Sequence, residues 1–596
     1  MSEERVSGFW AKVSSWLRLK FSDSERFLIL CIVAGVACGL TGVALHYAIG
    51  FIYELFFRPD SGHRPAWWVL LFAPALGGLV VGIVIHRFAP RAAGSGIPQT
   101  KEAYHNHFGM IRIKDGLFRF LTCTISVGMG NSVGREGPTA HICSAIAAKI
   151  GQTMGLAKMR LKAMVPVGMG AGIAAAFDTP LAAIFFVFEE LLGDFSSKAL
   201  GGLVVAVVVA AAVERTFLGE AAVLQVDTAV FEIDTWMLVS IPLGLVAALL
   251  GTLFVKSILA LRQRFKEWTL PPWLKPAVGG LGVGLIGTSV FFILQQQHLG
   301  VFGVGYQDLN ASLQGSLTFW VMVILFVGKF IATLFCYAAG GTGGIFAPVL
   351  FLGSMLGGIF GVALVEVVGF DSRIADACAL LGMGAFFAAV IRCPMTSILI
   401  IFEMTQNYSL ILPLMAGNMI AYFLARRLQG LSIYDALLVQ DRVSLKKLPT
   451  YRGDKDWRNL PVTTITTYEL VCVAGDQTMT AAFEAVCEKK HHAYPVIRLN
   501  EDGLNRLVGM ITYHELRDAW QKQSEVTVAD FIADQQLVYV HPDQSIRDVA
   551  NTLVVQDKMQ VPVVSQSDPE RLIGIVTLHD VARQQNAIED QIERGE

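Results

Sequence analysis

A single glutamate combines the features of an anion site and of a proton carrier. Glu136 stands in the motif GREGP at 134–138, between apolar segments that look buried in a membrane. An ionisable side chain at such depth is costly, which makes it a candidate substrate or proton site. The glycines expose backbone N–H groups, and Pro138 suits the first turn of a helix. A helix beginning just after Glu136 would direct its positive end toward a carboxylate or a free anion.

Two further loops share this design, GSGIP at 94–98 and GGIFAP at 343–348. Each has glycines that permit unusual backbone angles and then a proline that starts a helix. Any one of them could be an ordinary helix start. Three helix N-termini converging on one point would bind an anion through backbone dipoles alone. Such a site needs no lysine or arginine, whose full charge would hold a transported anion too tightly to release it.

The composition is that of a polytopic membrane protein in contact with lipid. Of 596 residues, 54% are hydrophobic and 16% are charged, against about 25% charged in soluble domains. The net charge of −2 excludes a strong attraction to nucleic acid. Nine cysteines lie in apolar runs without metal-ligand spacing, so they are predicted to be small core residues, and no metal site is expected.

Apolar runs and breaks alternate up to about residue 428. Runs that come close to or exceed the ~20 residues needed to span a bilayer are 27–49, 67–85, 236–259 and 319–337. Shorter or interrupted runs are 281–294, 345–356 and 377–391. The 57 glycines and the prolines in these runs indicate broken helices whose ends bind ions, or close packing between helices.

After residue 430 charges become frequent and an internal repeat appears. GMITYHEL at 509–516 matches GIVTLHDV at 574–581, and YPVI at 494–497 matches VPVV at 561–564. Each copy is predicted to form two strands and then a helix that begins at the His-Glu or His-Asp pair. The sequence therefore predicts two stacked copies of a small α/β unit.

Together with the pair Glu189 and Glu190 and with Tyr434, the three loops resemble the chloride channel (CLC) family of chloride channels and proton-coupled chloride exchangers, over about 23–437. The repeat resembles a tandem pair of CBS domains. The resemblance implies an all-α polytopic membrane domain of two inverted-topology repeats with broken helices. A cytoplasmic α/β tandem CBS domain would follow it, and the protein would be a homodimer with one pore per subunit.

The expected organisation has six parts. They are an N-terminal cytoplasmic helix at 1–24, a transport domain at 25–440 with repeats at about 25–215 and 235–437, a linker at 441–461, CBS copies at 462–523 and 524–586, and an acidic tail at 587–596. Basic residues before the first apolar run place the N-terminus in the cytoplasm. No secretory signal is visible, and we expect a bacterial inner membrane with both termini cytoplasmic.

Residue roles follow from the resemblance. The implied anion-binding residues are Ser95, Gly96, Ile97, Arg135, Glu136, Gly137, Ile345, Phe346 and Tyr434. Ser95 and Tyr434 would donate hydroxyls to a central chloride, and Glu136 would occupy an outer site until protonated. From the residues alone, Ser95 could be a turn residue and Tyr434 an interfacial aromatic. A serine at 95, where nitrate-favouring relatives have proline, favours chloride.

A second glutamate separates exchangers from channels in that family. Glu190 falls at the family's internal proton position, which favours antiport of chloride against protons, and Glu189 would be its charge-paired neighbour. The alternatives are that both merely end a membrane helix, and that the protein is a passive voltage- or pH-gated chloride channel. Dipole repulsion weakens the first alternative, because glutamates are unfavourable at a helix C-terminus. Asp178 is either a further acid that perturbs proton coupling or a helix cap.

No enzyme activity is predicted. The chain has no His-Glu-x-x-His zinc motif and no P-loop, and its core offers helix N-termini instead of the carboxylates that a divalent-cation transporter would need. No cofactor is required. Related CBS pairs hold adenine nucleotides, and Thr577 and Asp580 fit that pattern, but a ligand-free module that stabilises a dimer is the alternative.

Overall fold

The computed structural model of the chain describes residues 19–57, 65–193, 200–219, 233–370, 373–445, 457–489, 491–499 and 505–594. The chain divides into two compact units, Met1–Leu448 and Pro449–Glu596. Three predicted segments lie partly outside the described residues. They are most of the N-terminal helix at 1–24, much of the linker at 441–461 and the last two residues of the acidic tail.

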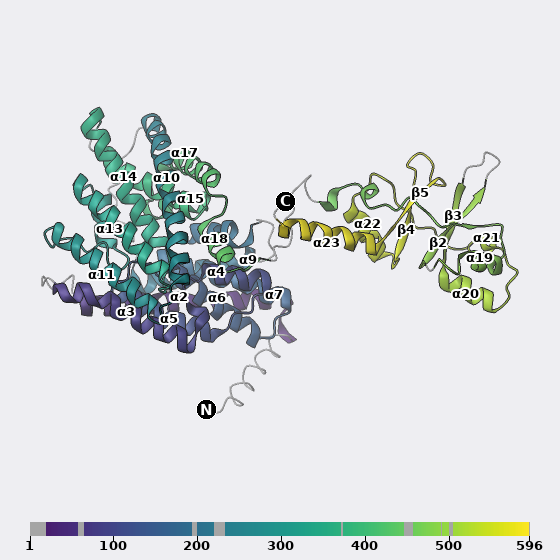
Figure 1. The fold of residues 1–596 in the computed structure, drawn as a ribbon, viewed down its shortest axis with the longest axis horizontal. Coiled ribbons are helices and arrows are strands. Elements are labelled where there is room, and N and C mark those ends of the chain that lie inside the picture. Colours follow the sequence, from purple (N-terminus) through teal and green to yellow (C-terminus); the bar gives the residue numbers. More distant parts are fainter. Residues whose placement is uncertain are drawn as a thin grey trace, which may run out of the picture. The chain divides into compact units, whose positions relative to one another are not determined.

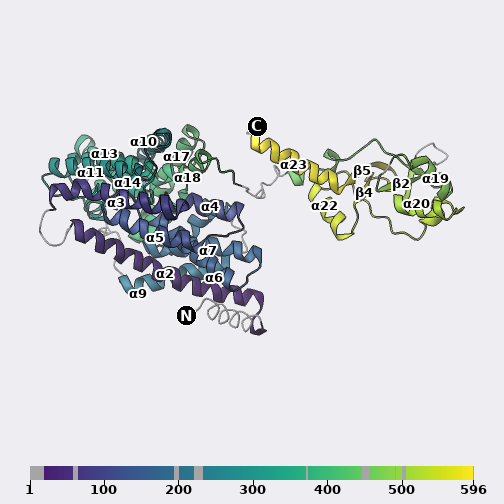
Figure 2. The same ribbon diagram turned by 60° about the horizontal axis from the view of Figure 1, so that its bottom comes forward.

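Helices build the first unit, and they fall into two consecutive sets. The first set is α2 (Asp23–Phe57), α3 (Trp67–Phe88), α4 (Ile97–Asn106), α5 (Ile113–Gly128), α6 (Glu136–Thr153), α7 (Lys158–Phe177), α8 (Pro180–Phe186), the π-helical turn η3 (Val187–Leu192) and α9 (Leu200–Leu218). The second set is α10 (Ile233–Glu267), α11 (Lys275–Ile293), α12 (Tyr306–Leu313), α13 (Phe319–Ala338), α14 (Phe346–Val368), α15 (Arg373–Val390), α16 (Pro394–Thr405), α17 (Ile411–Leu428) and α18 (Ile433–Gln440). In Figures 1 and 2 the purple-to-blue first set and the teal-to-green second set lie mainly on opposite sides of the unit.

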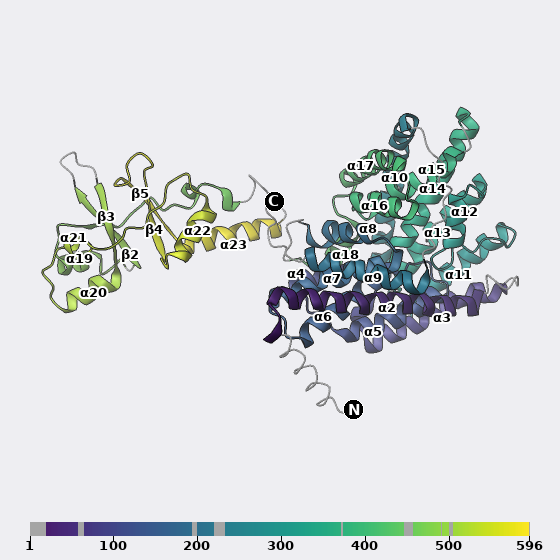
Figure 3. The same ribbon diagram turned by 180° about the vertical axis from the view of Figure 1, so that it is seen from behind.

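Equivalent elements follow the same order in the two sets. One glycine-proline loop leads into the hairpin α6–α7, and another leads into the hairpin α14–α15. Each hairpin is followed by a short helix that begins at a proline, α8 at Pro180 and α16 at Pro394. These two helices pack against each other (Figure 3). The arrangement confirms the predicted all-α membrane domain of two inverted-topology repeats with broken helices.

Within the described chain, eight helical segments are long and apolar enough to cross a membrane. They are Asp23–Phe57, Trp67–Phe88, Leu200–Leu218, Met237–Glu267, Lys275–Ile293, Phe319–Ala338, Phe346–Val368 and Tyr408–Gln440. The prediction that 281–294 and 345–356 are short runs is wrong, because α11 and α14 continue over 19 and 23 residues. The chain is an integral membrane protein, and its spans expose large apolar side chains such as Phe51 and Trp320.

Glycines in these helices let backbones touch and do not end the helices. A methyl group on Gly280 of α11 would lie 2.1 Å from the carbonyl oxygen of Pro74 on α3. A methyl group on Gly357 of α14 would lie 1.9 Å from the carbonyl oxygen of Cys378 on α15. Both distances are far below van der Waals contact, so a larger residue would force the helices apart. Close packing therefore explains why the glycine-rich runs form continuous helices.

Two copies of a strand–strand–helix motif form the second unit. In the first copy β2 (Ala493–Leu499) pairs antiparallel with β3 (Asn505–Thr512), and α20 (Tyr513–Gln521) follows. In the second copy β4 (Gln560–Val564) pairs with β5 (Leu572–Thr577), and α23 (Leu578–Arg594) follows. The other elements are β1 (Val473–Ala474), α19 (Met479–Val486), α21 (Val528–Phe531) and α22 (Ile546–Val555). The predicted repeat of a small α/β unit is confirmed.

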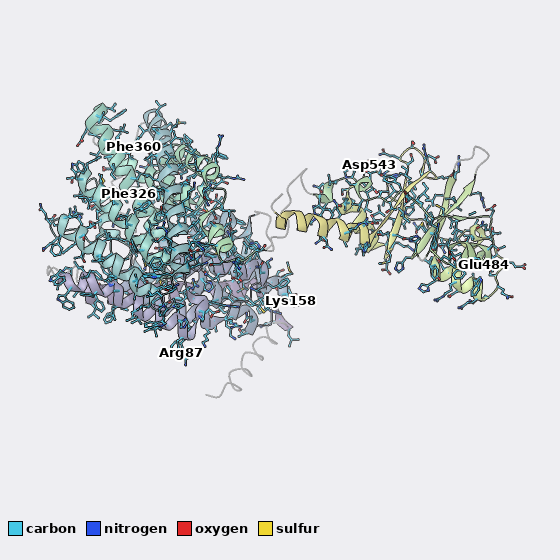
Figure 4. The ribbon with its side chains drawn as sticks, in the orientation of Figure 1. Arg87, Lys158, Phe326, Phe360, Glu484 and Asp543 are labelled. Atoms are coloured by element: carbon cyan, nitrogen blue, oxygen red, sulfur yellow. The ribbon has the colours of Figure 1, made fainter. Side chains whose placement is uncertain are left out.

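The two copies also agree in strand register. Val496 lies opposite Gly509, and Val563 lies opposite Gly574, the equivalent glycine of the repeated motif. A shift in register follows each of these valines. Side chains fill the space between the elements of each unit, as Figure 4 shows. Each copy of the repeat has its own apolar core.

Candidate functional site

Backbone hydrogen bonds join two of the three glycine-proline loops directly. The N–H of Gly134 donates to the Gly344 carbonyl oxygen at 2.6 Å, and the N–H of Gly344 donates to the Gly134 carbonyl oxygen at 2.7 Å. The third loop packs at the same place, since a methyl group on Gly137 would lie 2.8 Å from the Ser95 carbonyl oxygen. The N-termini of α4, α6 and α14 therefore converge, as the shared design of the loops predicts.

Glu136 lies where two of these helices begin. It is the first residue of α6, one position earlier than expected, and it is 1% exposed. Its Oε1 accepts a hydrogen bond from the Tyr306 hydroxyl at 3.3 Å, whereas Oε2 has no hydrogen-bond partner among the described residues. The carboxylate also lies near the backbone N–H of Ala347 in the first turn of α14. The positive ends of α6 and α14 thus both act on this carboxylate.

Groups from other helices bind the guanidinium of Arg135. It contacts the ring of His46 on α2 and donates to the Ala176 carbonyl oxygen at 3.2 Å. The backbone of Arg135 lies in the converging loops, and its charge also acts on the Glu136 carboxylate and on the Tyr306 hydroxyl. An anion at these loops would meet the partial positive charges of the helix ends as well.

Two hydroxyl side chains stand close to the same helix ends. Ser95 and Tyr434 are buried, and Ser95 Oγ accepts a hydrogen bond from the Ile97 N–H at 3.3 Å. The Tyr434 hydroxyl has no hydrogen-bond partner among the described residues. Tyr337 on α13 lies near both, because it interacts with the Ser95 side chain and with Tyr434. An unpaired buried donor is costly, so an anion would be a suitable partner for the Tyr434 phenol.

The other predicted anion-binding residues are backbone positions in these loops. Gly96 has a φ of 98°, a left-handed conformation that favours glycine, and it caps α4 just before Ile97. A methyl group on Gly96 would lie 2.4 Å from Nη1 of the fully buried Arg119. Ile345 caps α14 and Phe346 begins it, and both are buried.

Glu190 lies in the π-helical turn η3 and is buried. Its Oε1 accepts a hydrogen bond from the ammonium of Lys101 at 2.6 Å, and the Cys393 thiol lies 3.6 Å from Oε2. The same ammonium donates to Oδ1 of Asp435 at 2.6 Å. Glu190 is therefore a buried carboxylate inside a cluster of charges, which is a setting suited to proton transfer.

Glu189 has a different task from the predicted one. Its carboxylate accepts hydrogen bonds from the backbone N–H groups of Met395 and Thr396, at 3.0 and 2.8 Å, and so caps the N-terminus of α16. The expectation of a charge-paired neighbour is wrong, because helix N–H groups take the place of a cation. Glu403 on α16 caps the N-terminus of α8 in return, accepting from two backbone N–H groups at 2.9 and 2.8 Å. Each repeat thus caps a helix of the other.

Asp178 ends α7 in a left-handed conformation with a φ of 55°. Its carboxylate pairs with Arg215 on α9, with Arg215 Nε 2.7 Å from Oδ1. Of the two predicted roles, the position fits a helix cap, at the C-terminus of α7.

In the second unit Thr577 and Asp580 form the cap of α23. Asp580 Oδ2 accepts hydrogen bonds from the Thr577 N–H and hydroxyl, and Oδ1 accepts from Arg583 at 3.0 Å. Thr512 and Glu515 form the equivalent capping box of α20. A ribose hydroxyl would therefore have to share the Asp580 carboxylate with the cap and with Arg583.

Several residues that shape the first unit were not predicted, namely Lys101, Tyr306, Tyr337 and Glu403. Glu403 had a detectable signal, because it follows Pro394 by the same nine residues by which Glu189 follows Pro180. In the part of the chain that the structure describes, no group of three or more His, Cys, Asp or Glu side chains could hold a metal ion.

Comparison with known proteins supplies matches to both units. The family described as voltage gated chloride channel matches residues 77–426, and the CBS domain matches residues 462–522 and 528–586. The chain is 30% identical over 421 residues to the H(+)/Cl(-) exchange transporter ClcA of Yersinia pestis bv. Antiqua, covering 69% of this chain and 87% of that protein.

Two solved structures are also similar to this chain. A slow cyanobacterial Cl−/H+ antiporter superposes with a TM-score of 0.62 at 28% identity, covering 70% of this chain and 97% of that chain. A eukaryotic CLC transporter superposes with a TM-score of 0.59 at 18% identity, covering 93% of this chain and 97% of that chain, and shares the fold.

Proposed function

Because the chain belongs to the voltage gated chloride channel family and carries two CBS domains, we propose that it exchanges chloride for protons across the membrane. The observation that carries the proposal is the place of Glu136, whose buried carboxylate lies at the joined N-termini of α6 and α14. A carboxylate there is an anion that competes with chloride for the same helix ends.

Glu136 acts as the external gate and as a proton carrier. When it is ionised, the helix ends and the Tyr306 hydroxyl hold the carboxylate in the anion path. When it is protonated, it loses most of the attraction to the helix ends and leaves the path to chloride. Protonation and deprotonation of the Glu136 side chain therefore couple chloride transport to proton transport.

Neutral donors hold chloride at the central site. Ser95 and Tyr434 supply hydroxyls, and the loops supply backbone N–H groups from Ile345 and Phe346. A hydrogen bond from a neutral donor to a charged group contributes about 1.5–3 kcal/mol, which is enough to select an anion and still release it. Gly96, Ile97, Arg135 and Gly137 contribute backbone to the same path.

Glu190 is the internal proton relay. It is a buried carboxylate that lies apart from the loops, next to a lysine from the helix that follows the Ser95 loop. A passive chloride channel of the same fold is the second candidate, and it would need no acid at this position. The exchange transporter and the antiporter among the similar proteins support exchange.

The test measures chloride and proton movement together, with two electrodes outside liposomes that hold the purified protein. An outward chloride gradient should drive proton uptake into the liposomes. Glu136→Ala should retain chloride flux and lose proton movement, and Glu190→Gln should also lose proton movement. Glu366→Gln, a change at an exposed glutamate of α14, is the matched control and should leave both fluxes unchanged. Chloride flux without proton movement in the wild type would establish the passive channel instead.

The assembly belongs to the same proposal. The protein is a homodimer with one pore per subunit, set in a bacterial inner membrane with both termini in the cytoplasm. CBS domains commonly bind adenine nucleotides, and the proposed ribose-binding residues Thr577 and Asp580 would bind the ribose while they also cap α23. A lack of ATP binding in calorimetry of the full chain would leave the pair as a stabilising module.

A further inference from the structure

One ammonium group contacts two carboxylates inside the membrane unit. Lys101 Nζ lies 2.6 Å from Glu190 Oε1 and 2.6 Å from Asp435 Oδ1. The side chains of Lys101 and Glu190 are 3% and 4% exposed, and that of Asp435 is 28% exposed. The three groups come from α4, η3 and α18, elements that are far apart in the sequence. We call them the charge triad.

The charge triad connects the parts of the proposed transport site. Lys101 lies on α4, whose N-terminus follows the Ser95 loop, and Asp435 directly follows Tyr434 on α18. Glu190 is the proposed internal proton relay. The helix that follows the Ser95 loop and the helix that carries Tyr434 are therefore both held to the proton relay by the same lysine.

The formal charges of the triad favour the uptake of one proton by Glu190, because that proton brings the net charge of the triad to zero. With all three groups ionised the triad carries one positive and two negative charges, and with Glu190 protonated the ammonium and Asp435 remain as a balanced pair. Lys101 has a partner in both states, so neither state leaves a buried ammonium without compensation. Without Asp435, a proton on Glu190 would strand the ammonium. Without Lys101, two carboxylates would share the site.

Among the described residues, the other titratable groups that face or adjoin Glu190 are a thiol, a phenol, a carboxylate and an imidazole. The Cys393 thiol lies 3.6 Å from Oε2, and the Tyr434 phenol is also within electrostatic reach. Glu189 turns away to cap α16, and a ring nitrogen of His105 hydrogen-bonds the Leu191 carbonyl oxygen at 3.1 Å.

We propose that Lys101 and Asp435 are positioning residues that together set the pH range in which Glu190 takes up and releases its proton. The inference rests on the proposed function, because it assigns a partner to the proton relay named there. Lys101 opposes protonation of Glu190 and Asp435 favours it. Removing one or the other should therefore change proton uptake in opposite directions.

The test is an infrared titration of the full chain in lipid, which follows the carboxylic acid band that Glu190→Gln abolishes. Lys101→Met should move the midpoint of this band to higher pH, and Asp435→Asn should move it to lower pH. Each shift should be about one pH unit or more, the size expected when a charge within contact distance is removed. Lys101→Arg, which keeps the charge, should remain near the wild type, and the Lys101→Met, Asp435→Asn double variant should lie between the single variants.

Midpoints that coincide with the wild type in both single variants, or that move in the same direction, would overturn the proposal. A purely structural role would lower the amount of folded protein without opposite shifts, and gel filtration measures that amount. Proton uptake by liposomes is measured on the same samples. If the midpoints shift in opposite directions but the wild type shows no chloride-driven proton uptake, the role of the charge triad is supported and exchange is refuted. Failure of the charge-triad proposal and failure of the proposed function can therefore be told apart.

Discussion

Gly134→Ala tests whether the position of the Glu136 carboxylate controls the anion path. A methyl group on Gly134 would lie 2.1 Å from Glu136 Oε2. Restoring an ordinary contact of 3.4 Å requires the carboxylate to move by about 1.3 Å. Gly134 does not have a positive φ, so alanine adds no backbone strain of its own. The methyl group would also lie 3.0 Å from Cβ of Ala347 on α14, but the carboxylate is the end of a flexible side chain and should move most.

The size of the effect follows from the bond that is lost. When the whole carboxylate moves by this distance, the hydrogen bond from the Tyr306 hydroxyl to Oε1, already 3.3 Å long, is lost. A hydrogen bond to a charged group contributes about 1.5–3 kcal/mol, and each 1.4 kcal/mol is about a factor of ten in an equilibrium constant. The population with Glu136 in its buried position should fall by about 10- to 100-fold. Chloride flux should rise, and protons moved per chloride should fall toward zero.

The assay is the two-electrode liposome measurement, with thermal unfolding in detergent to detect any loss of stability. Gly430→Ala is the matched control, because a methyl group there meets no atom within 4 Å and its φ is not positive. Unchanged chloride flux and unchanged coupling in Gly134→Ala would refute the argument, since the carboxylate would then not need its observed position.

Three further changes should lower the thermal unfolding midpoint of the purified protein, with Gly50→Ala, whose methyl group meets nothing within 4 Å, as a neutral control. Glu403→Ala removes two helix-capping bonds and should cost about 1–2 kcal/mol; a midpoint equal to the wild type would argue against the cap. Gly280→Ala should force α3 and α11 apart and cost about 1–3 kcal/mol; an unchanged midpoint would show that the helices do not touch there. Lys329→Met removes a buried ammonium that contacts four carbonyl oxygens within 300–304 and should cost roughly 3 kcal/mol or more; full stability would contradict the structural role of that contact.

The features that the sequence predicted are local ones. The glycine-proline loops and the repeated strand–strand–helix motif depend on neighbouring residues, so their backbone conformations follow from residue types. Glu136 could be singled out because the cost of a buried carboxylate does not depend on the fold. The convergence of the loops is the exception, because it brings distant segments together, and it was inferred from the design that the three motifs share.

The features that the sequence did not predict depend on contacts between distant residues. Lys101 meets partners 89 and 334 positions away, and nothing in its own segment indicates either one. The expected role of Glu189 was wrong because a helix N-terminus from the other repeat occupies the place of a cation. The length of α11 was misjudged because a glycine that touches another backbone looks, in sequence, like one that ends a helix.

The reciprocal caps of α8 and α16 have a consequence for biosynthesis. Leu181 and the glutamate that binds its N–H are 222 residues apart, so the start of α8 is synthesised long before its cap. Until Glu403 has left the ribosome, these backbone groups have no partner from the chain and must be kept in water or in the insertion machinery. Assembly of the first repeat in lipid therefore finishes only when nearly the whole membrane unit has been translated.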